Sequence, residues 1–393
     1  MSKFLKGLAF TSVSLVALAA TARGPVDGPT LSFGGSLQGT AVGVNQKVRS
    51  EPAVTFQTTG DLVLSIGGTT TGGLTYGGLG VLSLDRSSSA SDRISEAYVY
   101  ATDDVFGSVK LGDLNGVDGT MMYRGTDVLS GTGGKDAYRY FNVTRGVDFR
   151  TTIEMTDDTA PKLVYTSPTI HGIQFGASYT PDTRLYGRFK TSNNISSSGT
   201  NNARATAPYA VNHLALALSY NHSFSMSNLG LYGVVATGKG KNTLSGPKAG
   251  NVNSWEIGSL FDYKNYQAAA GYFQNNNSLM RVGSKWSNTS GYDLGLAYDI
   301  SHNMNASVGL KHTERKVTGG KAKGDMLVLS MDYTIASGLV AFVEIDQISS
   351  KAPSAYINGV VPGQTGADLY AGKPKINKNN HGTLAIVGTK IRF

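Results

Sequence analysis

The chain has 393 residues, no cysteine, 50 glycines and 20 tyrosines, and only 16% of its residues are charged. The absence of cysteine excludes disulfides, thiolate metal sites and thiol catalysis. The charged fraction lies below the roughly 25% of an average soluble globular protein. The formal net charge of +8 would suit a nucleic-acid partner, so the compartment of the protein decides how that charge is interpreted.

The first 22 residues have the three parts of a secretory signal peptide. Lys3 and Lys6 form a basic start, an apolar stretch follows, and the small residues at 20–22 form a cleavage site. We expect residues 1–22 to be removed, with cleavage after Ala22, or after Ala20 as the alternative. Removal takes two lysines and no acid, so the formal charge falls from +8 to +6. Because an exported chain rarely meets nucleic acid, we expect no nucleic-acid partner and a charge spread over loops.

The mature chain, residues 23–393, is dominated by alternation of apolar and polar residues. No apolar run approaches the ~18 residues of a membrane helix, and no helical period is sustained. In "YDLGLAYDI", residues 292–300, the aromatic and aliphatic side chains all fall on one face of an extended chain. The same pattern predicts about sixteen strands, near residues 30–44, 54–67, 73–85, 93–102, 106–113, 161–167, 172–180, 211–222, 229–237, 254–263, 266–274, 291–300, 303–312, 326–335, 338–347 and 382–393.

Short and long connections alternate between these strands. Tight turns, such as the one between Tyr263 and Tyr266, are followed by long stretches rich in glycine, serine and asparagine, such as residues 180–210 and 313–325. Soluble sandwiches have no reason to place every long loop at one end, whereas a transmembrane β-barrel has short periplasmic turns and long outer loops. Tyrosines at strand ends would form its interfacial girdles. The sequence therefore predicts an all-β fold, an antiparallel transmembrane β-barrel of about 16 strands.

The C-terminal strand "HGTLAIVGTKIRF" ends on Phe393 with no tail. A closed barrel has no free edge, so this strand must pair with the first one. Phe393 and Ile391 then face the lipid, and Lys390 and Arg392 face the lumen. Leu384 and Ile386 share the parity of Lys390 and break the alternation.

At this point the chain resembles the general diffusion porins of Gram-negative outer membranes, of the alphaproteobacterial type. The similarity rests on "ISEAYVYATDDVFGSVKLGD" at residues 94–113, on "APKLVYTSPTIHGIQFGASYTP" at residues 160–181 and on the terminal strand. It implies a homotrimer of sixteen-stranded barrels embedded in outer-membrane lipid and lipopolysaccharide. It also implies that residues 114–160 fold inward as a constriction loop. The barrel-assembly machinery would read Phe393 and Ile391 as an insertion signal.

The Pro-Glu-Phe-Gly type of loop tip found in enteric porins is absent from residues 114–160, so no constriction residue can be carried over from the family. Opposite charges on an inserted loop and on the wall would create a field across the pore, and low-dielectric walls focus it. We expect acids of the loop to oppose basic residues of the wall. The candidates for the constriction are Arg93, Lys110, Arg124, Asp127, Lys135, Asp136, Arg139, Asp148, Lys390 and Arg392.

The predicted outer loops are rich in lysine, which leaves two interpretations. A basic mouth would concentrate anions and give a weak anion preference. Alternatively, the lysines bind phosphates of lipopolysaccharide and leave selectivity unchanged. The sequence contains no Gly-x-Ser-x-Gly elbow, P-loop or His-Glu-x-x-His motif. We therefore expect no enzyme activity and no cofactor, although Asp157 and Asp158 could contribute to a calcium site.

These observations favour an outer-membrane porin for passive diffusion of ions and small hydrophilic solutes. Two alternatives remain open. A substrate-selective uptake channel could use aromatic residues of the long loop, namely Tyr123, Tyr138, Tyr140 and Phe141. An adhesin or envelope-structural barrel would have a closed lumen.

Overall fold

The computed structural model describes residues 28–48, 53–84, 94–135, 140–153, 159–183, 209–241, 249–276, 287–317, 319–357 and 376–393. The expected signal peptide, residues 1–22, lies outside these ranges. Within them, no helix has both the length and the apolar character needed to cross a membrane.

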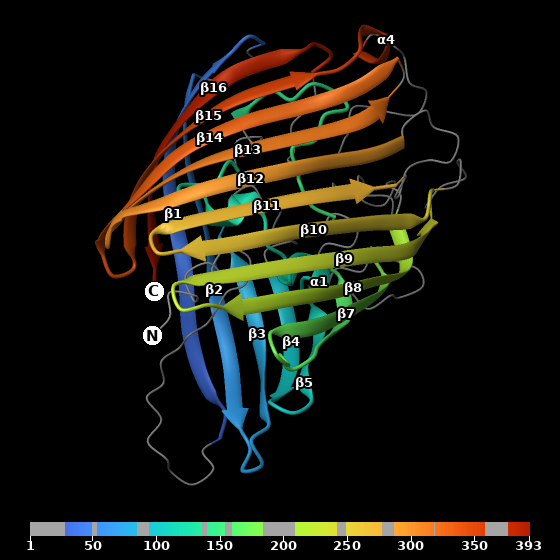
Figure 1. Cartoon of the computed structure of the whole chain (residues 1–393), viewed down its shortest axis with the longest axis vertical. Coiled ribbons are helices and arrows are strands. Elements are labelled where there is room, and N and C mark those ends of the chain that lie inside the picture. The colour runs from blue at the N-terminus through green and yellow to red at the C-terminus, as the bar shows by residue number, and fades with distance from the viewer. Residues whose placement is uncertain are drawn as a thin grey trace.

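Sixteen strands form one closed antiparallel barrel, in which each strand pairs with its neighbours in the chain and β16 pairs with β1 (Figure 1). The predicted fold class is confirmed. The strands are β1 (Thr30–Gln46), β2 (Val54–Thr69), β3 (Thr75–Ser83), β4 (Ile94–Asp103), β5 (Gly107–Asp113), β6 (Pro161–Thr166), β7 (Ile173–Asp182), β8 (Tyr209–Ser223), β9 (Ser227–Lys241), β10 (Val252–Tyr263), β11 (Tyr266–Asn275), β12 (Ser287–Ser301), β13 (Met304–Val317), β14 (Gly320–Ala336), β15 (Leu339–Lys351) and β16 (Asn380–Arg392).

The apolar face of each strand points out of the barrel. On β12, for example, Leu296 is 58% exposed while its neighbour Ala297 is 4% exposed. A large apolar surface of this kind is stable where lipid covers it. Strand-end tyrosines lie on the same outer face, and the rings of Tyr266 and Tyr298 contact each other with centroids 4.7 Å apart. The alternation thus places the hydrophobic surface on the outside of the barrel and leaves the inner face to contact water and other segments of the chain.

The last strand closes the barrel as the sequence predicts. Gly35 N donates to Phe393 O at 3.0 Å, and Phe393 N donates to Gly35 O at 3.2 Å. The side chain of Phe393 is 64% exposed and that of Ile391 46% exposed, both on the outer face. Leu384 and Ile386 point inward and are buried. Their departure from the usual pattern has a structural reason, because a segment from elsewhere in the chain packs on them.

The structure confirms the expected alternation of short and long connections but corrects the length of one of them. Short links at one end alternate with longer ones at the other, as predicted, except between β13 and β14. The long loop expected at residues 313–325 is wrong, because β13 continues to Val317 and β14 begins at Gly320. Past the apolar part of these two strands, polar residues occur on both faces. The hydrophobic alternation therefore stops there, although β13 and β14 remain paired. The register there pairs Glu314 with Lys323.

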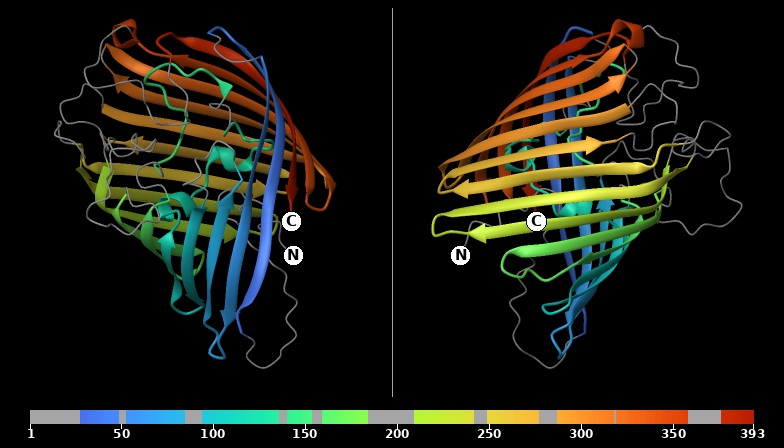
Figure 2. Two further views of the ribbon diagram at one scale, coloured as in Figure 1. Left: turned by 180° about the vertical axis from the view of Figure 1, so that it is seen from behind. Right: turned by 45° about the vertical axis from the view of Figure 1, so that its right-hand side comes forward.

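The described residues of the segment between β5 and β6, 114–135, 140–153 and 159–160, run inside the barrel rather than across its mouth (Figure 2). The segment contains a short helix, α1 (Val117–Thr120), and a 3₁₀ turn, η2 (Gly125–Val128). α1 packs on β7, β8 and β9, and η2 packs on β11, β12 and β13. We call the described part of residues 114–160 the inner loop. A further short helix, α4 (Ser354–Ile357), follows β15.

Candidate functional site

The inner loop packs on the inner wall of the barrel through two apolar clusters. The first joins Leu129, Phe141 and Phe149 of the loop to inward-facing residues of β13 to β16 and of β1. Phe141 is 1% exposed. The wall side of this cluster consists of Val42, Val44, Val317, Ala322, Met326, Val328, Phe342, Ile348, Leu384 and Ile386. Burial of these side chains removes apolar surface from the aqueous lumen and therefore stabilises the docked loop.

The second apolar cluster holds the beginning and the end of the loop. Val117, Met121 and Ile153 pack on inward-facing residues of β6 and β8 to β11, including Phe273 and Val234. Ile153 and Phe273 have no exposed surface. Contacts at several places along the loop therefore hold it against the wall, and its position does not depend on a single contact.

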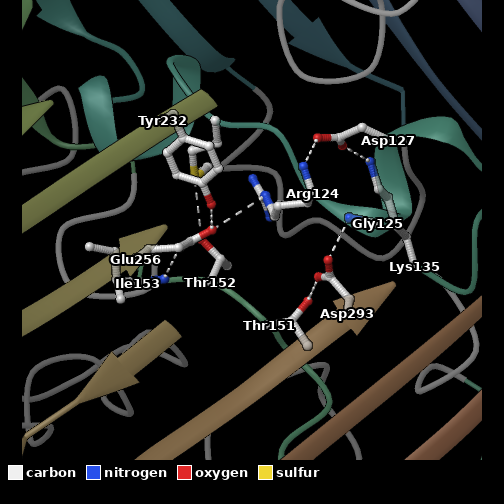
Figure 3. Close-up of polar contacts among 11 residues, drawn as sticks. Arg124, Gly125, Asp127, Lys135, Thr151, Thr152, Ile153, Tyr232, Glu256 and Asp293 are labelled. Atoms are coloured by element: carbon white, nitrogen blue, oxygen red, sulfur yellow. Dashed lines mark hydrogen bonds and ion pairs between the residues drawn. The ribbon is translucent and has the colours of Figure 1, made fainter. Parts of the chain in front are cut away.

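A buried carboxylate on β10, that of Glu256, accepts a hydrogen bond from the inner loop (Figure 3). Glu256 has no exposed surface. It accepts hydrogen bonds from the Tyr232 hydroxyl at 2.5 Å and from Ile153 N at 2.9 Å, and Arg124 Nε lies 3.9 Å from it. A buried charge is tolerable only where such donors replace water. Loop and wall are thus complementary at this point.

A second buried carboxylate, Asp293 on β12, bonds the loop at two places far apart in sequence. Gly125 N donates to one oxygen at 2.5 Å, and the Thr151 hydroxyl donates to the other (Figure 3). The loop backbone lies very close to β12 here, because a Cβ on Gly125 would stand 2.5 Å from the Leu294 carbonyl carbon. A Cβ on Gly295 would likewise stand 1.9 Å from Gly125 O. Glycine at both positions makes this approach possible.

The loop tip wraps the third buried carboxylate, Glu344 on β15. Backbone N–H groups of Thr132, Gly133 and Gly134 donate to its two oxygens at 2.6, 3.0 and 3.2 Å, and the Thr132 hydroxyl donates a fourth bond. Gly131, Gly133 and Gly134 have φ values of +62°, +63° and +64°. This left-handed conformation turns successive N–H groups toward one anion. We call residues 131–134 the glycine nest.

Two lysines and another acid complete the contacts of the glycine nest. Lys311 Nζ donates to Gly134 O at 3.1 Å, and Lys390 Nζ donates to Gly131 O. Gly131 N donates to the carboxylate of Asp332 at 2.7 Å. Donors and acceptors of the tip backbone are therefore both matched by charged groups of the wall. Charge-assisted hydrogen bonds of this kind are stronger than neutral ones.

Some charged side chains of the inner loop pair with one another. Lys135 Nζ lies 3.8 Å from Asp127, and Arg150 donates to Asp148 at 2.6 Å. Arg315 of the wall lies 3.8 Å from Asp148. The lysine side chain is 37% exposed, the most open of these charges. The loop thus presents a mixed and partly neutralised set of charges.

Strands β2 to β5 form a part of the inner wall with a different character. Lys110 Nζ lies 5.5 Å from the centroid of the Tyr98 ring. On the same wall Glu96 accepts a hydrogen bond from Asn115 Nδ2 at 2.9 Å. Many side chains of this face are polar and half-buried, while Val63 and Val81 are apolar and buried. A lumen bounded by this wall and by the docked loop can hold water and charged solutes.

The structure brings together some of the expected constriction residues and separates others. Arg124, Asp127 and Lys135 lie on the loop near the buried acids, Asp148 lies further along it, and Lys390 lies beneath the loop tip. Lys110 lies on the wall of β2 to β5, and Arg392 lies at the short-turn end, where its N–H donates to Gly338 O at 2.8 Å. Arg93, Asp136 and Arg139 fall outside the described residues. The role of each in the constriction stays a prediction.

The sequence analysis did not identify Glu256, Asp293 and Glu344 as loop anchors, although each alternates with outward-facing apolar residues on its strand. A usable signal was the run "SGTGG" at residues 130–134, which has too many glycines for a tip held by packing alone. Among the described residues, no group of three or more His, Asp or Glu could hold a metal ion. The calcium candidates Asp157 and Asp158 lie outside them.

Two of the aromatic residues expected to bind a selective solute, Tyr123 and Tyr140, contact the wall of the barrel. The Tyr123 hydroxyl donates to Asn221 Oδ1, and the centroid of its ring lies 6.0 Å from that of the Tyr232 ring. Burial raises the pKa of Tyr123 above its usual range, so the hydroxyl stays a neutral donor. The Tyr140 hydroxyl donates to Gln57 Oε1. Both tyrosines bond the loop to the wall, and Tyr138 lies outside the described residues.

Comparisons with known proteins agree with this architecture. A family model described as Gram-negative porin matches residues 8–353. Uncharacterized proteins of Rickettsia typhi and Rickettsia prowazekii are 26% and 25% identical, each match covering 73% of this chain and 74% of the relative.

Solved structures extend the comparison to nearly the whole chain. An anion-selective porin from Comamonas acidovorans matches 93% of this chain and 100% of its own, with a TM-score of 0.64 and 14% identity. OmpF of Salmonella typhi, in complex with daunomycin, matches 93% and 98%, with a TM-score of 0.60 and 15% identity. The trimer form of OmpT from Vibrio cholerae matches 93% and 100%, with a TM-score of 0.55 and 13% identity. At these identities the likeness shows a common fold.

Proposed function

Because the chain belongs to the Gram-negative porin family, and so forms a diffusion channel across the outer membrane, we propose that residues 114–160 set the width of that channel. One observation carries the proposal: backbone N–H groups of the inner loop bond to wall carboxylates on β10, β12 and β15. A loop held in this way narrows the lumen at a fixed place. The solutes are ions and small hydrophilic molecules, as expected for a sixteen-stranded barrel with an aqueous channel.

Planar-bilayer recording of the refolded protein tests the proposal. Conductance that rises with salt, with graded neutral polymers excluded at a defined size, is the expected result. Absence of current from a heat-stable, sheet-rich preparation would contradict an open channel. A polymer cut-off that stays unchanged after the inner loop is deleted would contradict its role in setting the width.

A homotrimer is the proposed assembly. The support is the shared fold with a porin whose solved structure is a trimer form. In recordings, current should appear in groups of three equal steps. Chemical cross-linking of the detergent-solubilised protein should stop at three chains. Steps that occur singly, together with a monomer in cross-linking, would contradict the assembly.

A weak preference for anions is proposed from the exposure of charges on the inner loop and on the wall beneath it. Glu256, Asp293 and Glu344 have at most 1% of their surface exposed, and Lys311 and Lys390 are buried as well. Lys135 on the loop keeps 37% of its side chain exposed. In a salt gradient we expect a reversal potential of the anion-selective sign, reduced by Lys135→Gln. A neutral or cation-selective potential would contradict the preference.

Phe393 and Ile391 are proposed as the signal by which the barrel-assembly machinery inserts the chain. They are the last two outward-facing residues of the closing strand, and both are exposed to lipid. Deletion of Phe393 should lower the amount of protein in the outer membrane while the purified chain still refolds in detergent. Equal insertion of the shortened chain would contradict this role.

A further inference from the structure

The connection between β15 and β16 returns to the inner loop at two places. Its first described part, residues 352–357, contains α4, which follows β15 at the end of the barrel opposite the short turns (Figure 1). Tyr356 of α4 is 1% exposed and belongs to the same apolar cluster as Phe141 and Phe149. A Cβ on Gly146 would stand 2.7 Å from Tyr356 Cε1, so the tyrosine ring lies directly against the loop backbone. α4 therefore packs on the second half of the inner loop.

The second described part of the connection pairs with the inner loop through backbone hydrogen bonds. Ile376 N donates to Val143 O at 3.1 Å, and Arg145 N donates to Ile376 O at 2.9 Å. Thr144 and Ile376 thus form an isolated parallel bridge. We call residues 376–380 the strap.

The far end of the strap is fixed in the barrel by Asn380, the first residue of β16. The Asn380 side chain is buried, and its Nδ2 donates to Asn142 O at 2.9 Å and to Gln46 Oε1 at 2.8 Å. Its Oδ1 accepts a hydrogen bond from Val48 N at 2.9 Å. One side chain therefore connects the strap, the inner loop and the end of β1.

Thr144 lies between the strap and the wall and has no exposed surface. Its N–H donates to Ser350 Oγ at 3.0 Å, and its hydroxyl lies 2.8 Å from both Ser350 O and Lys378 O. The backbone of Thr144 thus bonds to the wall, whereas Val143 and Arg145 bond to the strap. Because backbone groups shielded from water need partners, the strap completes the hydrogen bonds that the wall leaves open.

From these contacts we propose that the strap is a second clamp on the inner loop and that the channel width depends on it. The inference rests on the proposed role of the inner loop in setting that width. The buried acids of the wall bond the loop before residue 135 and after residue 150. The strap bonds residues 142–145, between these two sets of contacts. Its release frees this stretch from the wall, and the channel then opens to a wider level.

The test records single-channel current of the full refolded chain with graded neutral polymers. Ile376→Pro removes the N–H that donates to Val143 O. Lys378→Pro is the matched control in the same segment, because within the described part of the chain the Lys378 N–H donates no hydrogen bond. The control also keeps the carbonyl that Thr144 contacts. Loss of a donor to a shielded carbonyl should raise the population of the wider level by about 5- to 150-fold.

A reversible cross-link shows whether the wider level comes from release of the loop. The side-chain oxygens of Thr144 and Ser350 lie 2.7 Å apart, and the chain has no cysteine of its own. Thr144→Cys with Ser350→Cys, added to Ile376→Pro, therefore ties the same stretch to β15 without the strap. Oxidation should restore the polymer cut-off of the unchanged protein, and reduction should widen the channel again.

The outcomes separate the strap from the inner loop as a whole. An unchanged cut-off in Ile376→Pro, an equal effect of Lys378→Pro, or no return on oxidation would overturn the role of the strap. If deletion of the inner loop widens the channel while Ile376→Pro does not, the proposed function stands and the strap alone fails. If Ile376→Pro does not fold, Thr144→Val, which removes the hydroxyl beside Lys378 O, should widen the channel in the same direction. An unchanged cut-off in that variant would equally overturn the proposal.

Discussion

Two parts of the inner wall differ in what covers them. The wall of β8 to β16 together with β1, which we call the covered wall, packs on the inner loop, and its inward-facing residues include the apolar clusters and the buried acids that contact the loop. The wall of β2 to β5, the open wall, carries polar side chains and tyrosines at the same depth. The difference shows how one barrel combines a dry interface and a wet surface. The large apolar clusters of the inner wall lie where the inner loop removes water from them, while Val63 on β2 and Val81 on β3 are isolated buried apolar residues of the open wall.

The acids follow the same division. Glu256, Asp293 and Glu344 on the covered wall are buried and bonded to loop N–H groups. Glu96 on the open wall stays partly exposed and accepts a hydrogen bond from the side chain of Asn115 in the inner loop. An acid on the covered wall is therefore buried beneath the loop backbone, whereas the acid on the open wall keeps part of its surface toward the permeating solutes. Substitutions on the two walls should consequently have different effects.

Removal of an anchoring acid should have the largest effect. Glu344→Ala leaves three backbone N–H groups of the glycine nest without their anion. Each buried donor left unsatisfied typically costs about 1–3 kcal/mol. We expect a lower urea midpoint in detergent and noisier current with a larger polymer cut-off. Glu96→Ala is the control, and equal noise in both variants would contradict the division between the walls.

Truncation of an inward-facing apolar residue should come next. Ile386 is 1% exposed beneath the loop, while its neighbour Val387 is 58% exposed on the outer face. Ile386→Ala should cost about 2–5 kcal/mol through the cavity that it leaves. Val387→Ala creates no cavity and should cost much less. Unfolding of the two variants in the same detergent gives the comparison, and similar midpoints would mean that the loop does not pack on β16.

A change in the glycine nest should have a moderate effect. Gly131→Ala combines a φ of +62° with a Cβ 2.4 Å from Glu344 Oε2. Gly73→Ala, in a short turn, has a φ of +92° but no atom within 4 Å of its Cβ. Left-handed strain alone costs about 1–2 kcal/mol, so Gly131→Ala should lose more stability than Gly73→Ala. The reverse order would show that the nest adapts freely.

A conservative change on the open wall should have the smallest effect on stability and a visible one on selectivity. Glu96→Gln should change the free energy of unfolding by less than about 0.5 kcal/mol, as for most exposed sites. Removal of a negative charge from the lumen should move the reversal potential toward anions. The same measurement on Glu256→Gln serves as the comparison. A larger shift from the buried acid would contradict the withdrawal of its charge from water.

The sequence predicted the barrel because alternation is local and each membrane-crossing segment carries it. Both strands of the β13–β14 hairpin were predicted, but their extension to Val317 and back to Gly320 was missed, because Glu314, Lys316, Lys321 and Lys323 give no hydrophobic period there. The docked loop could not be predicted from period alone. Its partners are distant, as in the 212-residue separation of Thr132 from Glu344. Leu384 and Ile386 did carry the information, since inward-facing apolar residues in a water-filled barrel require a covering segment.

The most direct test of the docked loop uses the absence of native cysteine. Ser130 N donates to Ser307 Oγ at 2.8 Å, so Ser130→Cys with Ser307→Cys places two thiols at the contact between loop and covered wall. Single-channel current would be recorded before and after reduction. We expect the disulfide to form readily and the conductance to be the same in both states. A conductance that rises on reduction, or a disulfide that does not form, would show that the loop normally lies elsewhere.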